Sequence, residues 1–470
     1  MSESQPRDPR LAGTAIADSV IELIGDTPLV RMKRIMETER LTAVLAMKME
    51  TSNPGGSSKD RPALEMIVAA ERDGSLQPGG TIVEPTSGNT GVGLAIVAAQ
   101  RGYSCVFVMT DKVAPEKVSL LKAYGAEVIV CPVAVAPDDP TSYYKVAERL
   151  TQERNAFRPN QYANPNNPLA HTKTTGPEIW RQTDGRITHF VAGAGTCGTI
   201  TGTARFLKEQ NPNVRIIAAD PAGSVFSGGS GRPYLVEGVG EDFFPAAWQP
   251  DLYDEVIAIS DEESFLTART VSRVEGILIG GSGGLAVAAA IQVARRAGPD
   301  DIVVVLNPDS GRGYLSRVFD DAWMANYGFL TECDQCIGAV LDARNATLDN
   351  LLYVGPTTTV RSAIDTMRAN GVSQLPVCKN TPPFAVAEVS GSVDELELME
   401  SIANDSAAMD LPVEQVMGPK LPTIGIGQKL DLAIEMLHTS PALLVLSGGR
   451  PLSVLTRTDI LSYFEARAQG

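Results

Sequence analysis

Short apolar runs alternate with helical patterns from about Ile16 to Leu330, and this alternation constrains the fold more than any other feature of the chain. Runs such as TIVEPT (81–86), SCVFVMT (104–110) and EVIVCPV (127–133) are continuously apolar, which is typical of strands buried on both faces. Similar runs recur at 186–195, 215–220 and 301–311. Strands separated by helices require crossover connections. We therefore expect an α/β fold with mostly parallel sheets and helices on both faces.

The C-terminal part of the chain contains an internal repeat, which indicates a separate module. The stretch TVRSAIDTMRANGVSQLPV (359–377) is similar to KLDLAIEMLHTSPALLVL (429–446). Matching apolar positions with the spacing of one helix face are Val360, Ala363, Ile364 and Met367 in the first copy and Leu430, Ala433, Ile434 and Leu437 in the second. Each copy ends in an apolar strand and a second helix. We expect a first domain over 1–330, a linker over 331–348, and repeat units over 349–405 and 412–470.

Composition and charge exclude several classes of protein. The net charge of −16 argues against a nucleic-acid partner, because phosphate binding needs a basic surface. No apolar run approaches the roughly 20 residues needed to cross a bilayer, so we expect no membrane partner. The segment MSESQPRDPR lacks an apolar signal core. Six scattered cysteines do not make a disulfide framework, and a reducing cytoplasm fits best.

Four stretches rich in small residues indicate a ligand site. The segment NPGGSSKDR (53–61) places Lys59 behind two glycines and two serines, and three Gly/Ser/Thr stretches follow predicted strands at 84–91, 193–202 and 280–284. Backbone N–H groups in such loops bind anions, especially at helix N-termini. Any one of these stretches could be a plain turn, and Lys59 could be a solvated surface lysine. Together they favour a bound phosphorylated cofactor.

The residue patterns of the loops favour one cofactor over the others. There is no G-x-x-x-x-G-K-[ST] pattern for a nucleotide. The segment GAGTCG (193–198) has the spacing of a dinucleotide fingerprint, and Asp220 keeps that alternative open. Pyridoxal 5′-phosphate uses a lysine Schiff base and one phosphate, so it accounts for both Lys59 and an anion loop.

Segments between Ile21 and Leu330 resemble a known family. They include IGDTPLVRM, NPGGSSKDR, IVEPTSGNTGVGLA, NQYANPNNPLAH, GTCGTITG, EGVGEDF and NPDSGRGYLSRVFDDAWMANYGFL. In this order they resemble the fold-type II pyridoxal-phosphate β-replacement enzymes, which share the tryptophan synthase β-like fold, and the cystathionine β-synthases most closely. The C-terminal repeat resembles a pair of CBS domains, which regulate many of those enzymes.

The resemblance implies a set of cofactor-binding residues. Lys59 would form the Schiff base and act as the general base, Asn89 would hydrogen-bond the ring hydroxyl, and Ser282 would face the pyridine nitrogen. The phosphate loop would comprise Gly195, Thr196, Cys197, Gly198 and Thr199. Cys197 stands where the family usually has glycine, and a cysteine with a positive φ would be strained.

The resemblance also implies a substrate site and a reaction. The α-carboxylate pocket would comprise Thr86, Ser87, Gly88, Thr90 and Gln161. The segment 237–243, with Gly238 and Glu241, would line the entrance, and some family members have tyrosine in place of Glu241. The implied reaction joins L-serine and L-homocysteine into L-cystathionine and water. The alternatives are a cysteine synthase that uses O-acetylserine and sulfide, and a catalytically silent metabolite sensor.

The resemblance to CBS domains also suggests how the chain could be regulated and how it could assemble. Thr456 and Asp459 match an effector motif of CBS domains, whereas Asp394 in the first copy would repel a phosphate. S-adenosylmethionine is the effector that the family suggests, and the alternative is a dimerisation module without a ligand. A homodimer or homotetramer is expected.

The remaining cysteines and histidines carry weaker signals. Cys333 and Cys336 form a C-x-x-C without a second pair, so we expect linker thiols or a redox switch rather than a metal site. The family resemblance implies that animal members carry a heme on an N-terminal segment. Here the first cysteine is Cys105 and the first histidine is His171, so no earlier residue matches those heme ligands and no heme is expected. We interpret the three histidines as structural.

Overall fold

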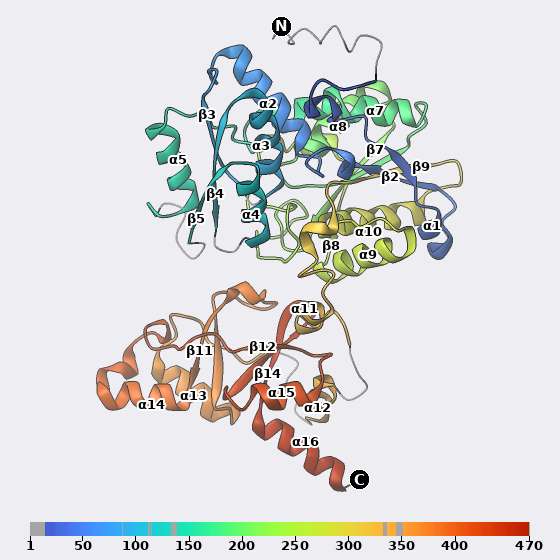
Figure 1. The fold of residues 1–470 in the computed structure, drawn as a ribbon. Coiled ribbons are helices and arrows are strands. Elements are labelled where there is room, and N and C mark those ends of the chain that lie inside the picture. The colour runs from blue at the N-terminus through green and yellow to red at the C-terminus, as the bar shows by residue number, and fades with distance from the viewer. Residues whose placement is uncertain are drawn as a thin grey trace. The chain divides into compact units, whose positions relative to one another are not determined.

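The computed structural model describes residues 15–86, 88–110, 113, 115–132, 139–331, 336–344 and 351–469. The described part of the chain divides into two compact units (Figure 1). The first runs to Gly231 and resumes over Val236–Tyr314, and the second comprises Arg232–Leu235 and the chain from Leu315 onward. No helix in these ranges is long and apolar enough to cross a membrane.

A six-stranded sheet forms the centre of the first unit. In spatial order its strands are β1 (Leu29–Arg31), β2 (Val44–Met49), β9 (Ile302–Asn307), β6 (His189–Gly193), β7 (Arg215–Pro221) and β8 (Glu255–Ile259). All neighbours are parallel except β1, which pairs antiparallel with β2. Figure 1 shows α7 (Thr175–Gln182) and α8 (Gly198–Gln210) on one face and α9 (Asp261–Glu275) and α10 (Gly281–Arg296) on the other.

A separate three-stranded parallel sheet completes the first unit. It consists of β3 (Thr81–Pro85), β4 (Ser104–Thr110) and β5 (Glu127–Cys131). The remaining helices of this unit are α1 (Lys33–Glu39), α2 (Asp60–Asp73), α3 (Asn89–Arg101), α4 (Pro115–Ala123), α5 (Tyr143–Glu153) and α6 (Asn166–Lys173). The predicted α/β fold with mostly parallel sheets is confirmed.

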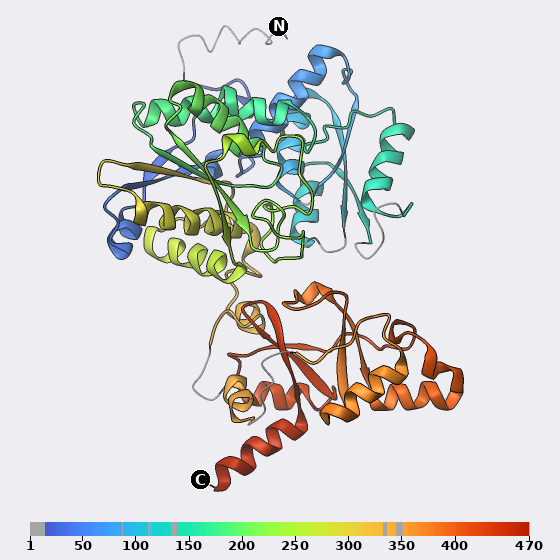
Figure 2. The ribbon, with the colours of Figure 1, turned by 180° about the vertical axis from the view of Figure 1, so that it is seen from behind.

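The second unit contains the predicted repeat, which Figure 2 shows from behind in orange and red. The first copy contains α13 (Val360–Asn370), β10 (Gln374–Cys378), β11 (Val389–Asp394) and α14 (Glu395–Asn404). The second contains β12 (Thr423–Gly425), α15 (Leu430–Met436), β13 (Ala442–Ser447), β14 (Arg450–Thr456) and α16 (Arg457–Gln469). The predicted helix faces are confirmed, because Val360, Ala363 and Met367 are buried in one core and Ala433 and Leu437 in another.

The expected linker at 331–348 is not simply extended chain. It contains a helix, α12 (Ile337–Ala343), and α11 (Asp321–Asn326) precedes it. Ile337 and Val340 of α12 are buried in the core of the second repeat copy. The sequence pattern missed this helix because only one turn of it is apolar. Cys333 lies outside the described residues.

Candidate active site

Lys59 lies at the end of a tight turn and directly before α2. Ser58 N–H donates to the carbonyl of Pro308 (2.8 Å), and Ser57 forms a β-bridge with Asp309, so the turn is fixed to the segment after β9. Gly56 has φ +75°, which favours glycine. Burial lowers the pKa of the Lys59 amine below its ordinary value, although nearby carboxylates oppose the shift.

One cavity brings Lys59 together with the predicted phosphate loop. Its lining comprises Ser58, Lys59, Gly193, Gly195, Thr196, Cys197, Thr199, Gly238, Val239, Leu306 and Pro308. The buried hydroxyl of Ser58 has no hydrogen-bond partner among the described residues. At Gly195, a Cβ atom would lie 3.1 Å from the carbonyl oxygen of Gly238, so the backbone must pass close there. A buried amine, an unpartnered hydroxyl and a backbone cradle fit a phosphorylated cofactor that carries a carbonyl group.

The predicted phosphate loop connects β6 to the first turn of α8. Cys197 precedes α8 with φ +62° and ψ 0°, so this position does adopt the left-handed conformation. Its side chain is buried, and its Sγ donates to the carbonyl of Gly195 at 3.3 Å. A Cβ atom on Gly198 would lie 1.9 Å from Asn167 Oδ1, so only glycine fits there. The N-terminus of this 13-residue helix faces the loop and favours an anion.

Two residues that the sequence analysis did not assign to the site support this loop. Asn167 Nδ2 donates to Thr196 Oγ1 at 3.1 Å and to the carbonyl of Gln161 at 2.8 Å. His171 Nε2 lies 3.1 Å from Thr199 Oγ1. Burial holds the pKa of His171 well below its ordinary value, so the ring is neutral. Both lie on α6, where nothing in the residue pattern pointed to a loop almost 30 residues away.

The predicted carboxylate pocket lies between β3 and α3. Thr86 follows β3, and its Oγ1 accepts from the N–H of Gly88 at 3.2 Å. Thr90 Oγ1 donates to Gln161 Oε1 at 2.7 Å, so the structure brings these two residues together. Ser87 lies outside the described residues.

Asn89 and Ser282 both lie near the segment after β9. Asn89 begins α3, and its Nδ2 donates to Asp309 Oδ2 at 2.8 Å. Ser282 is buried in the first turn of α10. At Gly280, just before α10, a Cβ atom would lie 2.2 Å from Asp309 Oδ1. Asp309 also accepts from the hydroxyl of Tyr314 at 2.7 Å, and burial raises its pKa. The sequence analysis missed Asp309, although an acidic residue in a loop directly after a buried strand is a usable signal.

Lys117 is a second missed residue. It forms an ion pair with Glu237 and lies 4.9 Å from the centre of the Tyr314 ring. Its Cδ would lie 3.4 Å from a Cβ atom on Gly88. Lys117 therefore connects the carboxylate loop to the entrance segment.

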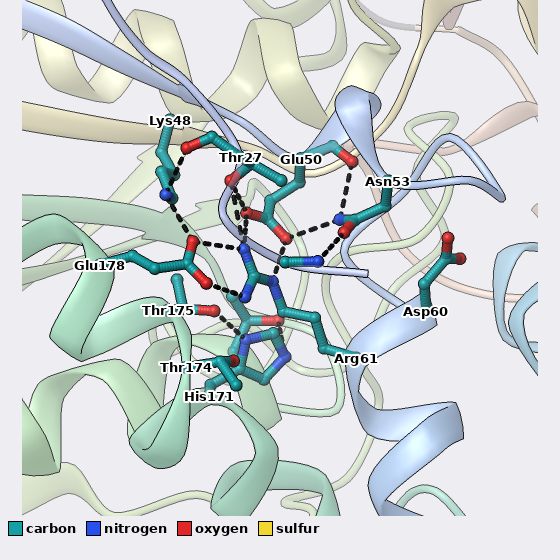
Figure 3. A network of polar contacts seen from close by, with 12 residues as sticks. Thr27, Lys48, Glu50, Asn53, Asp60, Arg61, His171, Thr174, Thr175 and Glu178 are labelled. Atoms are coloured by element: carbon teal, nitrogen blue, oxygen red, sulfur yellow. Dashed lines mark hydrogen bonds and ion pairs between the residues drawn. The ribbon is translucent and has the colours of Figure 1, made fainter. Parts of the chain in front are cut away.

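A buried ionic network surrounds Arg61 in the first turn of α2, the helix that Lys59 directly precedes (Figure 3). Arg61 Nε donates to Glu50 at 2.6 Å, and its Nη1 donates to Glu178 at 2.6 Å. Lys48 Nζ donates to the other oxygen of Glu178 at 2.7 Å. Burial alone would raise the pKa of Glu178, but these two cations outweigh burial and lower it to about 2. The network fixes the position from which Lys59 projects.

The predicted entrance segment reaches the cavity through Gly238, and a carboxyl group follows it in the chain. Gly238 lines the cavity, and Glu241 follows three residues later. Burial raises the pKa of Glu241 to about 7, and the positive charge of Lys59 opposes that shift. The cavity thus combines a buried amine, a backbone cradle for an anion and an unpartnered hydroxyl, which together suit proton transfer at a bound ligand.

The predicted effector residues lie in the second unit. Asp459 Oδ2 accepts from the backbone N–H and the hydroxyl of Thr456, both at 2.6 Å. Arg344 forms an ion pair with Asp459. In the first copy, Asp394 accepts from the N–H of Glu397 at 2.8 Å and caps α14.

Comparisons with known proteins show which family this chain belongs to. The family described as pyridoxal-phosphate dependent enzyme matches residues 20–309, and the CBS domain matches 343–400 and 413–466. Cystathionine beta-synthase of Oryctolagus cuniculus is 38% identical over 97% of this chain and 86% of its own length. A probable cysteine synthase of Bacillus subtilis is 46% identical over 66% of this chain and 98% of its own. A hydrogen sulfide-producing enzyme of Fusobacterium nucleatum has a TM-score of 0.61 and 37% identity over 65% of this chain and all of its own.

Proposed function

Because the chain belongs to the cystathionine β-synthase family of pyridoxal-phosphate dependent enzymes, we propose that it replaces the β-hydroxyl of L-serine with the sulfur of L-homocysteine. The products would be L-cystathionine and water. β-Replacement is the reaction class of this family. The choice of L-serine and L-homocysteine as the two substrates is what we propose.

One observation carries this choice of substrates. The similarity to the rabbit cystathionine beta-synthase continues through both the catalytic part and the CBS pair, over 97% of this chain. The similarity to the bacterial probable cysteine synthase covers only 66% of this chain.

The residues of the site can be given roles in this reaction. Pyridoxal 5′-phosphate, when bound, supplies an electron sink for negative charge at the substrate α-carbon. The phosphate loop before α8 would hold its phosphate, and Lys59, Asn89 and Ser282 would hold the ring. Ser282 presents a neutral hydroxyl, which cannot enforce a protonated ring nitrogen as an aspartate could.

Lys59 would move the α-proton. A buried amine with a lowered pKa has a larger neutral fraction near pH 7, and only the neutral amine accepts a proton. Thr86, Gly88, Thr90 and Gln161 would bind the α-carboxylate through hydroxyl, amide and backbone donors. This would orient the α-hydrogen toward Lys59.

The test compares two substrate pairs on cofactor-loaded protein. We expect kcat/KM for serine with homocysteine to exceed kcat/KM for O-acetylserine with sulfide, both measured by product chromatography. A clear preference for the second pair would support the other candidate, a cysteine synthase, which the 46% identity to the bacterial protein favours. Turnover of neither pair by protein that carries the cofactor would support a catalytically silent sensor.

We also propose that the CBS pair binds an adenosyl ligand through Thr456 and Asp459. Asp459 already pairs with Arg344, so a ribose would compete with this cation for the carboxylate. S-adenosylmethionine, which lacks phosphates, avoids repulsion by acidic residues such as Asp394. Titration calorimetry of the full chain should show binding of S-adenosylmethionine that Asp459→Asn weakens. If S-adenosylmethionine released no heat of binding and did not raise the unfolding temperature, the alternative that the CBS pair is a dimerisation module without a ligand would be favoured.

A further inference from the structure

Ser58 lines the cavity beside Lys59, and its hydroxyl is not used by the protein itself. The backbone N–H of Ser58 donates to the carbonyl of Pro308 at 2.8 Å, which fixes the residue in place. Ser58 is only 1% exposed, and its Oγ has no hydrogen-bond partner among the described residues. Of the buried side chains in the described part of the chain that have an unpartnered polar atom, only Ser58 lines this cavity. Because buried polar groups are nearly always hydrogen-bonded in native proteins, we expect a ligand to supply the partner.

The preceding serine has a different environment. Ser57 is also 1% exposed, but its Oγ accepts from the backbone N–H of Lys59 at 3.2 Å. It is not among the residues that line the cavity. The hydroxyl of Ser57 therefore supports the turn, whereas that of Ser58 is left for a ligand.

The other lining residues indicate which part of the cofactor Ser58 would meet. Apart from Lys59, the cavity is lined by members of the predicted phosphate loop, which are Gly195, Thr196, Cys197 and Thr199, and by Gly193, Gly238, Val239, Leu306 and Pro308. Asn89 and Ser282, which are expected to hold the ring, do not line it. Nor does any described residue of the predicted α-carboxylate pocket. The cavity therefore corresponds to the phosphate end of the cofactor.

The charges around the cavity show why an extra hydroxyl would matter. Among the described residues that line it, Lys59 alone has a cationic side chain, and its amine is expected to bond to the carbonyl carbon of the cofactor. The phosphate must then be held by backbone N–H groups and hydroxyls. Thr196 Oγ1 and Thr199 Oγ1 already contact Asn167 and His171. A hydroxyl without a protein partner can donate to an anionic oxygen, and such hydrogen bonds are stronger than neutral ones.

We propose that the hydroxyl of Ser58 donates a hydrogen bond to the phosphate group of pyridoxal 5′-phosphate. The phosphate is then recognised by the turn that carries Lys59 as well as by the loop before α8. No covalent bond forms or breaks in this contact. The inference uses the cofactor class that the family match gives and does not depend on the choice of substrates.

A pair of ligands that differ only in the phosphate gives a direct test. The full-length protein, freed of cofactor, is titrated with pyridoxal 5′-phosphate and with pyridoxal, and binding is followed by absorbance. Ser58→Ala should weaken binding of pyridoxal 5′-phosphate by about 10-fold or more, the usual effect of losing a hydrogen bond to a charged group. Binding of pyridoxal, which has the same ring and carbonyl group, should not change. Equal losses for the two ligands, or no loss for either, would overturn the proposal.

Ser57→Ala is the matched control. It removes a hydroxyl from the adjacent buried position and disturbs the backbone of Lys59, which both ligands need. It should therefore weaken both ligands by the same factor. If Ser57→Ala also weakened only pyridoxal 5′-phosphate, any disturbance of the turn would be enough to weaken phosphate binding, and the assignment to Ser58 would fail.

Unfolding in urea separates a contact with the ligand from a contact within the protein. Without cofactor, Ser58→Ala should be at least as stable as the unmodified protein, because removing an unpartnered hydroxyl breaks no hydrogen bond. With pyridoxal 5′-phosphate at the same free concentration, the unmodified protein should gain more stability than the variant, by mass action. A variant that is already less stable without cofactor would show that the hydroxyl has a partner inside the protein, which would contradict the proposal.

These measurements include no amino-acid substrate, so they are independent of the proposed reaction. A preference of the enzyme for O-acetylserine and sulfide would overturn the proposed function alone. Equal losses of pyridoxal 5′-phosphate and pyridoxal binding in Ser58→Ala would overturn this inference alone.

Discussion

At the scale of single residues, Cys197 combines an unfavourable backbone conformation with a central position in the loop proposed to hold the phosphate. Its φ of +62° costs a non-glycine residue about 1–2 kcal/mol. Its buried side chain belongs to the core that contains Ile200 and Ala194, and that burial recovers part of the cost.

Two substitutions at Cys197 distinguish backbone strain from packing. Cys197→Gly should change the free energy of unfolding by no more than about 1 kcal/mol, because relief of strain offsets the lost burial and the added freedom of the unfolded chain. Cys197→Val should cost more than about 2 kcal/mol, because a β-branched residue is disfavoured at this φ. Denaturant unfolding of both variants provides the measurement. A valine variant as stable as the glycine variant would show that the loop tolerates another conformation.

A functional residue can be predicted from the sequence when its neighbours in the chain mark it as unusual. Lys59 stands out because glycines and serines precede it and a helix follows. Asp309 does not, because its contact with Asn89 spans 220 positions and only the fold creates it. The contact between His171 and Thr199, which lie 28 positions apart, is likewise created only by the fold.

At the scale of elements, the turn before α2 depends on two glycines for different reasons. A Cβ atom on Gly55 would lie 2.4 Å from Asp60 Oδ1, and Gly55 N–H donates to Asp60 Oδ2 at 2.5 Å. Gly56 has open space around it but a φ of +75°. Gly55→Ala should cost about 1–3 kcal/mol through overpacking and weaken cofactor binding. Gly56→Ala should cost only about 1–2 kcal/mol through strain. Denaturant unfolding measures the two losses of stability, and titration with the cofactor, followed by absorbance, measures its affinity for each variant. If the Gly55→Ala and Gly56→Ala variants bound the cofactor equally well, the steric role of Gly55 would be contradicted.

The ionic network behind the turn gives a second prediction for α2. Arg61→Met leaves Glu50 buried without its cation and Glu178 with Lys48 alone, and should cost about 3–5 kcal/mol. The exposed pair of Arg149 and Glu153 provides the control, and Arg149→Met should cost less than about 1 kcal/mol. Urea unfolding at pH 7 measures both.

Acid should remove the contribution of this network in a defined range. The pKa of Glu178 is lowered from 4.5 to about 2 in the folded state, so its stabilisation is complete above the unfolded value. The stabilisation is lost as the pH falls from about 4.5 toward 2. Arg61→Met should show a shallower loss of stability over that range than the unmodified protein. Parallel acid dependences would mean that Arg61 does not cause the lowered pKa.

The elements themselves were predictable where burial leaves a simple pattern. The central residues of β3 and β4 are buried, as the predicted runs require. The position of β5 also agrees with its predicted run, but the expectation that this strand is buried on both faces was wrong, because Val130 is 51% exposed. Which strands form which sheet was not predicted, since strand pairing depends on contacts between distant segments. Nor was α12, whose burial depends on a repeat copy that follows almost 90 residues later.

At the scale of the whole molecule, the two compact units have separate hydrophobic cores. The second unit is long enough to bury a core of its own. Scanning calorimetry should therefore resolve two unfolding transitions, one of which rises when pyridoxal 5′-phosphate is added, by mass action. Leu443→Ala, in the core of the second repeat copy, should cost about 2–5 kcal/mol and lower only the transition that the cofactor does not move. Ile216→Ala, in the core around β7, should lower only the cofactor-sensitive one. A single transition that both substitutions lower equally would mean that the units unfold as one cooperative body.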